Sequence, residues 1–182
     1  MYLNKKVTNK VLIIFSALLI TINLFIPAAK AYAESTSVLE EQVGEMFKEE
    51  VQCLAENIYH ESASESFEGK LAVAQVTLNR VNSGKFPTTV CGVVKQKTII
   101  QGVMVCQFSW FCNKAYTKLV RNQYQWEESV IVAKKALTSA VAHDRMYEQK
   151  ALYYHAQYVN PGWKLQKVGQ IGNHIFYREN KI

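Results

Sequence analysis

An apolar stripe with helical spacing, running into a cluster of carboxylates, constrains this chain more than any other feature of its sequence. The stripe is made of Val43, Phe47, Val51, Leu54 and Ile58. Steps of three to four residues predict an amphipathic helix with this side packed on a core. One further turn reaches Glu61, and the next reaches Glu65. If the helix continues that far, Glu61 faces the apolar side, where loss of hydration raises the pKa of a carboxyl group.

Glu61 has two interpretations. A helix-end glutamate is ordinarily solvated. A partly buried one keeps its proton near neutral pH and can protonate a leaving oxygen, as cleavage of a glycosidic bond requires. Glu65 either shares a helical face with Glu61, as the carboxylate pair of a retaining glycosidase would, or follows the end of the helix as a capping or supporting residue.

Two further helices are expected. Ser66 is a suitable N-cap, with Glu68 in the first turn, for a helix through the largely apolar run KLAVAQVTLNRVN, and Gly84 is a suitable end. The next helix is expected at about residues 126–143. Between them, residues 86–124 are expected to be irregular, with short helices and loops.

The C-terminal part of the chain is aromatic and alternating instead. The runs ALYYHAQYV (151–159) and NHIFYR (173–178) suit strands, and Asn160-Pro161-Gly162 suits a turn. Helices first and a small antiparallel sheet last predict an α+β fold.

Residues 1–33 have the features of a secretory signal peptide. Three early lysines precede an uncharged run from Val11 to Ile26, and Ala31 and Ala33 fit a small-x-small cleavage site. The run has 16 residues, fewer than the roughly 20 of a spanning helix, so cleavage after Ala33 is favoured over a retained anchor. We therefore expect an exported protein, secreted or associated with the cell envelope, with no stable membrane span after cleavage.

The remaining chain suits one compact domain at residues 46–182, with residues 34–45 forming a linker and the start of the first helix. Four of the 21 basic residues lie within the signal, which leaves 17 against 15 acidic residues. From Gly69 to Trp126 there are eight basic residues and no acidic one. This stretch is either a solvated face or a surface for an anionic polymer. Nucleic acid is a disfavoured partner because the chain is exported.

An even number of cysteines in an exported chain suggests two disulfides. Cys53, Cys91, Cys106 and Cys112 allow three pairings, and the sequence does not choose among them. A zinc site is the alternative, but no C-x-x-C pair is present.

Several catalytic motifs are absent. His60-Glu61 starts like the H-E-x-x-H motif of zinc proteases, but Ser64 stands where the second histidine is needed. The chain has no G-x-S-x-G elbow, a single aspartate (Asp144) and no glycine-rich phosphate loop.

Aromatic residues gather near the C-terminus. They are Tyr153, Tyr154, Tyr158, Trp163, Phe176 and Tyr177, with His155 and His174 among them. Sugar rings stack on aromatic faces while polar groups fix their orientation, whereas the alternative is a small aromatic core. We expect both, with one face of the strands packed and the other lining a groove.

Three sequence blocks together resemble the cell wall hydrolase family of the spore-cortex-lytic (SleB/CwlJ) type. They are LAENIYHESASESFEGKLAVAQVTLNRVNSGKFPTTVCGVV, CQFSWFC, and YYHAQYVNPGW with IGNHIFYR, within about residues 51–178. The resemblance implies a mostly helical, lysozyme-like domain acting on peptidoglycan glycan strands at the β-1,4 bond between N-acetylmuramic acid and N-acetylglucosamine. It further implies lytic transglycosylation, which leaves a 1,6-anhydro-muramic end and needs no metal or cofactor.

The family's catalytic glutamate is the first acid of a pattern like Y-x-E-A-R-G-E. Here the pattern reads Tyr59-His60-Glu61-Ser62-Ala63-Ser64-Glu65, which assigns the catalytic role to Glu61. The chain departs from the pattern where Ser62, Ala63 and Ser64 replace Ala-Arg-Gly, so a candidate charge partner is lost. Position within the three blocks makes the following residues candidates for binding substrate: Glu65, Gln107, Ser109, Tyr154, His155, Tyr158, Trp163 and His174.

Three alternatives remain open at this stage. A hydrolytic muramidase would use water as the acceptor. A noncatalytic wall-binding module would keep the aromatic residues and the basic face without a buried acid. A zinc amidase would cut peptide stems instead of sugars. The family includes spore germination, vegetative and phage-encoded members, and targeting would come from the domain itself or from an accessory protein.

Overall fold

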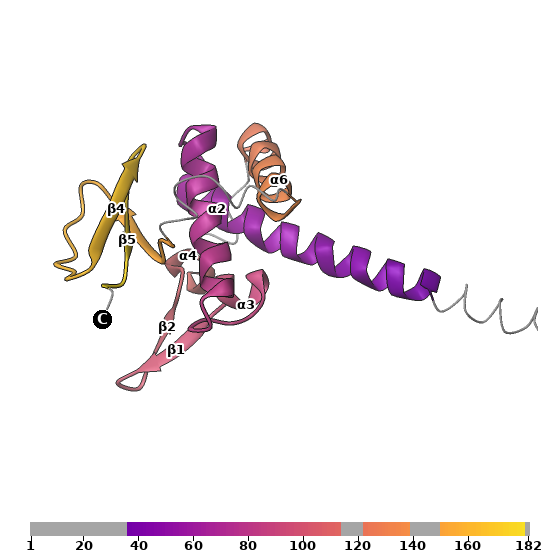
Figure 1. The fold of residues 1–182 in the computed structure, drawn as a ribbon, viewed down its shortest axis with the longest axis horizontal. Helices are drawn as coiled ribbons and strands as arrows, with labels where there is room; N and C mark the ends of the chain where they lie inside the picture. Colours follow the sequence, from indigo (N-terminus) through magenta and orange to yellow (C-terminus); the bar gives the residue numbers. More distant parts are fainter. Residues whose placement is uncertain (1–35, 114–121, 139–149, 181–182) are drawn as a thin grey trace, which may run out of the picture. The chain divides into compact units, whose positions relative to one another are not determined.

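The computed structural model describes residues 36–113, 122–138 and 150–180 (Figure 1). The chain divides into two units, residues 1–46 and 47–182. In the first unit the described residues, 36–46, are helical. The expected signal peptide lies outside the described residues. Within the described ranges, no helix is long and apolar enough to cross a membrane.

The larger unit begins with a helix over residues 47–62, called here the leading helix. The Leu54 side chain on this helix is fully buried in the main core. By contrast, Val43 and Phe47 are 63% and 39% exposed. The predicted apolar stripe is therefore buried only from Val51 onward.

Helix α2 (Phe67–Asn82) begins and ends close to where the sequence predicts. The Ser66 hydroxyl accepts a hydrogen bond from the Gly69 amide at 3.2 Å, which satisfies one of the free amides of the first turn. Gly84 follows with a φ of +71°, a conformation that ends a helix at little cost only for glycine.

Helix α2 lies in the middle of this unit and contacts α3 (Val90–Val94), α6 (Gln123–Thr138) and β4 (Gln166–Ile171) (Figure 1). The Lys70 ammonium, on a residue only 3% exposed, donates to Glu128 of α6 at 2.8 Å. The expected helix at 126–143 is thus α6, and the part of that prediction beyond residue 138 lies outside the described residues.

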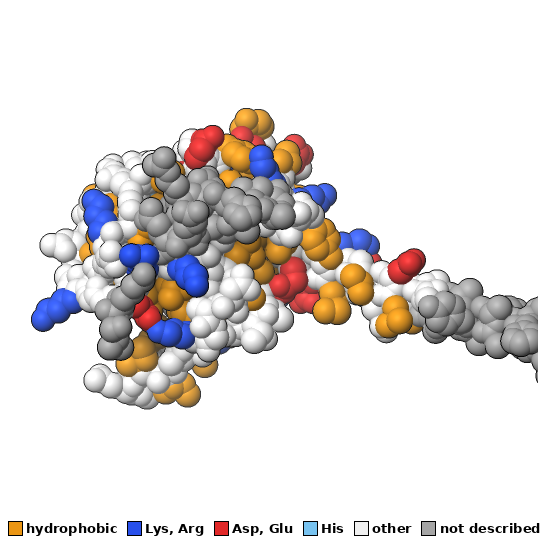
Figure 2. Space-filling view, viewed as in Figure 1, with side chains coloured by type: hydrophobic (Ala, Val, Ile, Leu, Met, Phe, Trp, Pro, Cys, Tyr) orange, Lys and Arg blue, Asp and Glu red, His pale blue; other side chains and the backbone are white. Residues whose placement is uncertain are grey.

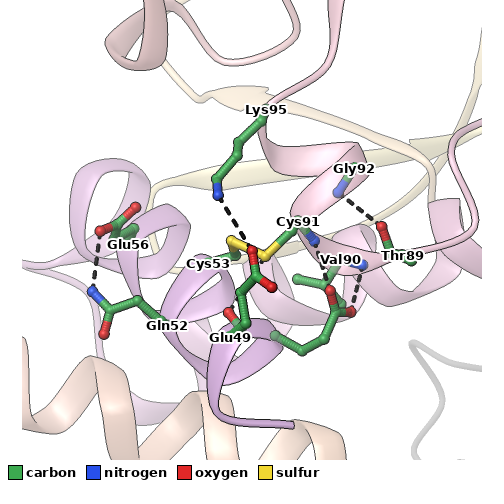
Figure 3. The surroundings of a disulfide bond; sticks show 10 residues. Glu49, Gln52, Cys53, Glu56, Thr89, Val90, Cys91, Gly92 and Lys95 are labelled. Carbon is green, nitrogen blue, oxygen red and sulfur yellow. Dashed lines mark hydrogen bonds and ion pairs between the residues drawn. A yellow bond between two sulfur atoms is a disulfide. The ribbon is translucent and has the colours of Figure 1, made fainter. Parts of the chain in front are cut away.

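Two disulfides form, Cys53–Cys91 and Cys106–Cys112. The first joins the leading helix to α3 (Figure 3). Beside it the Glu50 carboxylate accepts hydrogen bonds from the amides of Val90 and Cys91 at 2.7 and 3.1 Å, and Lys95 lies 3.9 Å from Glu49 (Figure 3). The start of α3 is therefore tied to the leading helix by a covalent bond and a carboxylate cap.

Residues 97–106 form a hairpin in the segment that we expected to be irregular. Its strands are β1 (Lys97–Ile100) and β2 (Val103–Cys106), paired antiparallel around a turn at Gln101-Gly102. Apolar side chains are exposed on both of its faces, because paired Ile99 and Met104 are 73% and 59% exposed and the next pair along is also exposed. Hydrophobic side chains are accordingly visible at the bottom of Figure 2, where the hairpin projects in Figure 1. The strands lack the polar–apolar alternation by which half-buried strands are recognised.

Short helix α4 (Ser109–Cys112) follows the hairpin, and three strands then form the C-terminal sheet. They are β3 (Tyr153–Ala156), β4 and β5 (His174–Arg178), in the antiparallel order β3-β5-β4. The predicted pair of strands is confirmed as β3 and β5. Strand β4 was not predicted, because its sequence QKVGQI is largely polar and its pairing is irregular between Lys167 and Gly169. The predicted α+β class is confirmed.

We expect the two disulfides to contribute unequally to stability. Cys53–Cys91 closes a loop of 38 residues and Cys106–Cys112 one of six. Loss of loop-closure entropy in the unfolded chain predicts about 4 kcal/mol for the first and about 2 kcal/mol for the second. Urea unfolding of the paired variants C53A/C91A and C106A/C112A, each against the oxidised wild type, measures this difference. An equal or reversed order would contradict it.

Candidate active site

A cavity of about 330 Å³ lies where the leading helix, α2, β3 and the β2–α4 connection meet. It brings together residues from all three sequence blocks that we singled out. Its lining residues are Glu61, Arg80, Cys106, Gln107, Phe108, Ser109, Tyr153, Tyr154 and Trp163. Five of the nine candidates from the sequence are among them: Glu61, Gln107, Ser109, Tyr154 and Trp163.

Glu61 lies in the last turn of the leading helix. The Tyr154 hydroxyl donates a hydrogen bond to Glu61 Oε2 at 3.1 Å. Burial raises the pKa of Glu61, and the Tyr154 hydrogen bond and the positive charge of Arg80 oppose this effect without cancelling it. The carboxyl group therefore stays protonated to a higher pH than a solvated glutamate.

Tyr154 remains a hydrogen-bond donor over the whole neutral range. Burial, and then the adjacent Glu61 carboxyl, raise the pKa of Tyr154 well above its usual value. Strand β3, which carries it, is fixed to α2 by two side chains. Asn79 donates to the Ala151 carbonyl at 2.9 Å, and Arg80 Nε donates to the Leu152 carbonyl at 2.8 Å.

Glu65 does not line the cavity, because the helix ends at residue 62. Its carboxylate accepts hydrogen bonds from the Asn173 amide at 3.2 Å and from Asn173 Nδ2 at 2.9 Å. His174 Nδ1 lies 3.9 Å from Glu65 Oε1. Glu65 therefore does not share a helical face with Glu61. It follows the end of the helix as a supporting residue, and it holds the β4–β5 turn.

Three other sequence candidates also lie outside the cavity lining. The His155 ring stacks on Tyr177, and its Nε2 is 3.0 Å from the Tyr177 hydroxyl. His174 is mostly buried, and burial lowers its pKa, against the opposing effect of Glu65. Tyr158 is 87% exposed. A substrate-binding role for these residues stays a prediction.

Trp163 offers a half-exposed aromatic surface at the cavity. It is 42% exposed and meets the rings of Tyr153, His155 and Tyr177 edge-on at 5.5 to 6.1 Å. An indole held in this way by its neighbours is a rigid platform on which a sugar ring can stack.

Four cavity residues were not among the catalytic or substrate-binding candidates chosen from the sequence: Arg80, Cys106, Phe108 and Tyr153. For Arg80 a signal existed, since it is a cation within a run that is otherwise predicted to be buried, and such residues are rarely buried without a function or a partner. Among the described residues, no cluster of three or more His, Cys, Asp or Glu side chains could hold a metal ion.

Comparison with known proteins identifies the family to which the chain belongs. The sequence profile of the family described as Cell Wall Hydrolase matches residues 64–177. The chain belongs to the cell wall hydrolase family. The predicted recognition is thereby confirmed, and the matched region takes in Glu65, α2, the hairpin and the C-terminal sheet.

Individual relatives agree with this assignment. The chain is 31% identical over 129 residues to the spore cortex-lytic enzyme of Oceanobacillus iheyensis and 32% identical over 134 residues to that of Bacillus cereus. These alignments cover 70% of this chain but only 41% and 43% of the relatives, so the chain spans less than half of their length. The catalytic domain of the germination-specific lytic transglycosylase SleB from Bacillus anthracis has a similar fold, with 28% identity, a TM-score of 0.50 and coverage of 71% of this chain and 93% of that one.

Replacing Gly172 by alanine is expected to break the Glu65 contact with the sheet. A Cβ at this position would overlap Glu65 Oε2, whereas Gly162 has a similar positive φ and open space around it. Both G172A and G162A incur about 1–2 kcal/mol for the backbone conformation. G172A should cost about 1–3 kcal/mol more, because the hydrogen bonds to the carboxylate are disturbed. Equal unfolding free energies for the two variants in urea would rule out this role of Glu65.

Glu61→Gln is expected to stabilise the fold in a pH-dependent way. The folded protein holds the Glu61 proton more tightly than the unfolded chain does, because burial raises its folded-state pKa. Wild-type stability therefore falls as pH rises through the window between the two pKa values. In urea unfolding, the free energy of unfolding of Glu61→Gln should exceed that of the wild type at pH 7. The difference between the two proteins should be smaller at pH 4. Glu68→Gln, at an exposed position in the first turn of α2, is the control. A gain that is independent of pH would contradict the burial of an ionisable acid.

Proposed function

We propose that this chain is an exported, peptidoglycan-cleaving glycosidase that acts on the β-1,4 bond between N-acetylmuramic acid and N-acetylglucosamine by lytic transglycosylation. The observation that carries the proposal is the Glu61 carboxyl, with its pKa raised by burial, in the wall of a cavity that also offers aromatic and polar side chains. Membership of the cell wall hydrolase family, and similarity to proteins named spore cortex-lytic enzymes and to a lytic transglycosylase catalytic domain, support the substrate class.

Glu61 is the proposed general acid. The Tyr154 hydroxyl engages Oε2, so Oε1 is the oxygen left to carry the proton to the glycosidic oxygen. Protonation lets the leaving sugar depart and positive charge develop at C1 of the muramic acid. Trp163 and Tyr153 in the cavity wall provide the surface that positions the sugar rings.

The second step uses the same carboxyl group. Glu61, now ionised, takes the proton from the C6 hydroxyl of the muramic acid as that oxygen bonds to C1, which closes the 1,6-anhydro ring and restores the protonated acid. Tyr154 and the positive charge of Arg80 both favour the ionised form of Glu61, which limits the energy of this intermediate state.

A single-acid mechanism is favoured over a retaining hydrolase with two carboxylates. Of the described residues that line the cavity, Glu61 is the only carboxyl group. The nearest carboxylate in the sequence pattern, Glu65, is engaged by Asn173 at the edge of the sheet. A covalent sugar–enzyme intermediate would need a second carboxylate about 5 Å from the first.

Glu61→Gln should remove at least about 99% of the activity of the wild type on purified peptidoglycan, since general acid catalysis contributes on the order of 100-fold or more. Mass spectrometry of the released fragments should show 1,6-anhydro-muramic ends, and the rate should decline above the raised pKa of Glu61, as its proton is lost. Glu68→Gln, outside the cavity, should match the wild type.

Other outcomes assign other functions. Reducing muramic ends would indicate a hydrolytic muramidase. Equal release by wild type and Glu61→Gln, or no release by either, would contradict the enzyme proposal, and binding without release would indicate a wall-binding module. Chelator-sensitive release of peptide stems would indicate a zinc amidase.

A further inference from the structure

Arg80 is a buried cation without an anionic partner. It is 4% exposed, and the one hydrogen bond of its guanidinium to a described residue runs from Nε to the Leu152 carbonyl. Its Nη1 is sealed from solvent with no hydrogen-bond partner. No described carboxylate forms an ion pair with it. Burying a charge in this way is costly unless another group satisfies it.

The guanidinium is held firmly. It lies 5.2 Å from the centre of the Phe86 ring and 5.3 Å from that of Phe108, and Nε is fixed to the backbone just before β3. Two aromatic contacts and one hydrogen bond leave little freedom for its planar group. The position of the terminal nitrogens is therefore set before any ligand arrives.

The cavity does not supply the missing anion. Its ionisable lining residues besides Arg80 are Glu61, Tyr153 and Tyr154. The pKa values of all three are raised, mainly by burial, so these groups favour their neutral forms. A ligand with an acidic or carbonyl oxygen would complete the hydrogen bonding of Arg80, because guanidinium donors match carboxylate geometry.

We propose that Arg80 is a specificity-determining residue that donates a hydrogen bond to the carbonyl oxygen of the lactyl group on muramic acid, whether that group is a free carboxylate or is amide-linked to a peptide. This inference rests on the proposed function of the same cavity. In the glycan, N-acetyl groups occur on both sugars, whereas the lactyl group occurs on muramic acid alone. A cation that recognises it distinguishes the two kinds of β-1,4 bond that alternate along the strand and selects the one presented to Glu61.

The test measures binding without cleavage, in the Glu61→Gln background, by isothermal titration calorimetry. The two probes are a tetrasaccharide of alternating N-acetylglucosamine and N-acetylmuramic acid with free lactyl carboxylates, and the N-acetylglucosamine tetrasaccharide. We expect the muramic probe to bind at least about tenfold more tightly than the N-acetylglucosamine tetrasaccharide, because a hydrogen bond to a charged group contributes a free energy of that size. Adding Arg80→Gln should abolish the preference while leaving affinity for the second probe nearly unchanged, and Arg80→Lys should retain part of it.

Arg178→Gln is the matched control, because Arg178 lies on β5, outside the cavity lining, with its Nε on Gln166; it should keep the full preference. Equal affinities of the Arg80-intact protein for the two probes would overturn the inference, even if Arg80 variants fail to fold. Equal weakening of both probes by Arg80→Gln would also overturn it, as would no binding of either. A muramic preference in a protein that cleaves no peptidoglycan would instead reject the proposed function and leave the role of Arg80 standing.

Discussion

The hydrogen bond from the Tyr154 hydroxyl to Glu61 is the contact on which the cavity depends. It joins residues 93 apart in sequence, one at the end of the leading helix and one on the C-terminal sheet. Neither element could position the carboxyl group alone, because the helix ends one residue after Glu61. Strand β3 is in turn held on α2 through Asn79 and Arg80. The helical and sheet parts of the unit therefore meet at the Glu61 carboxyl group. Helix α2 also supplies Arg80, the cation in the lining of the same cavity.

Two glutamates four residues apart have opposite environments because the leading helix ends between them. The Ser62 hydroxyl donates to the Ile58 carbonyl at 2.9 Å, and the Glu65 amide donates to the Ser62 carbonyl at 2.9 Å, so the chain turns before Glu65. Glu65 gains two hydrogen bonds from Asn173 and is committed to structure. Glu61 keeps one donor and a desolvated site, which suits the general acid of the proposed mechanism.

The sequence predicted those elements whose ends or composition carry strong local signals. Helix α2 has a serine cap and a terminal glycine, and β3 and β5 carry aromatic residues, so all three were predictable. The β1–β2 hairpin and β4 were not, since one is apolar on both faces and the other mostly polar. The motif pointed to Glu61, and position within the blocks pointed to Gln107 and Ser109. All three line the cavity, and their roles stay predictions. A cation within a run predicted to be buried marks Arg80, but the residues that lie beside it in space come from distant segments, which the sequence of α2 does not specify.

The departure from the family pattern at residues 62–64 also has a physical consequence. Ser62 is 2% exposed and bonds back to the helix, so it helps to end the helix, and Ser64 is solvated. Arg80 is the one cation among the described residues that line the cavity, and burial remains the largest influence on Glu61. In the proposed mechanism, burial therefore favours the protonated form of Glu61 before bond cleavage, and Arg80 is the cavity cation that favours the carboxylate formed after proton transfer.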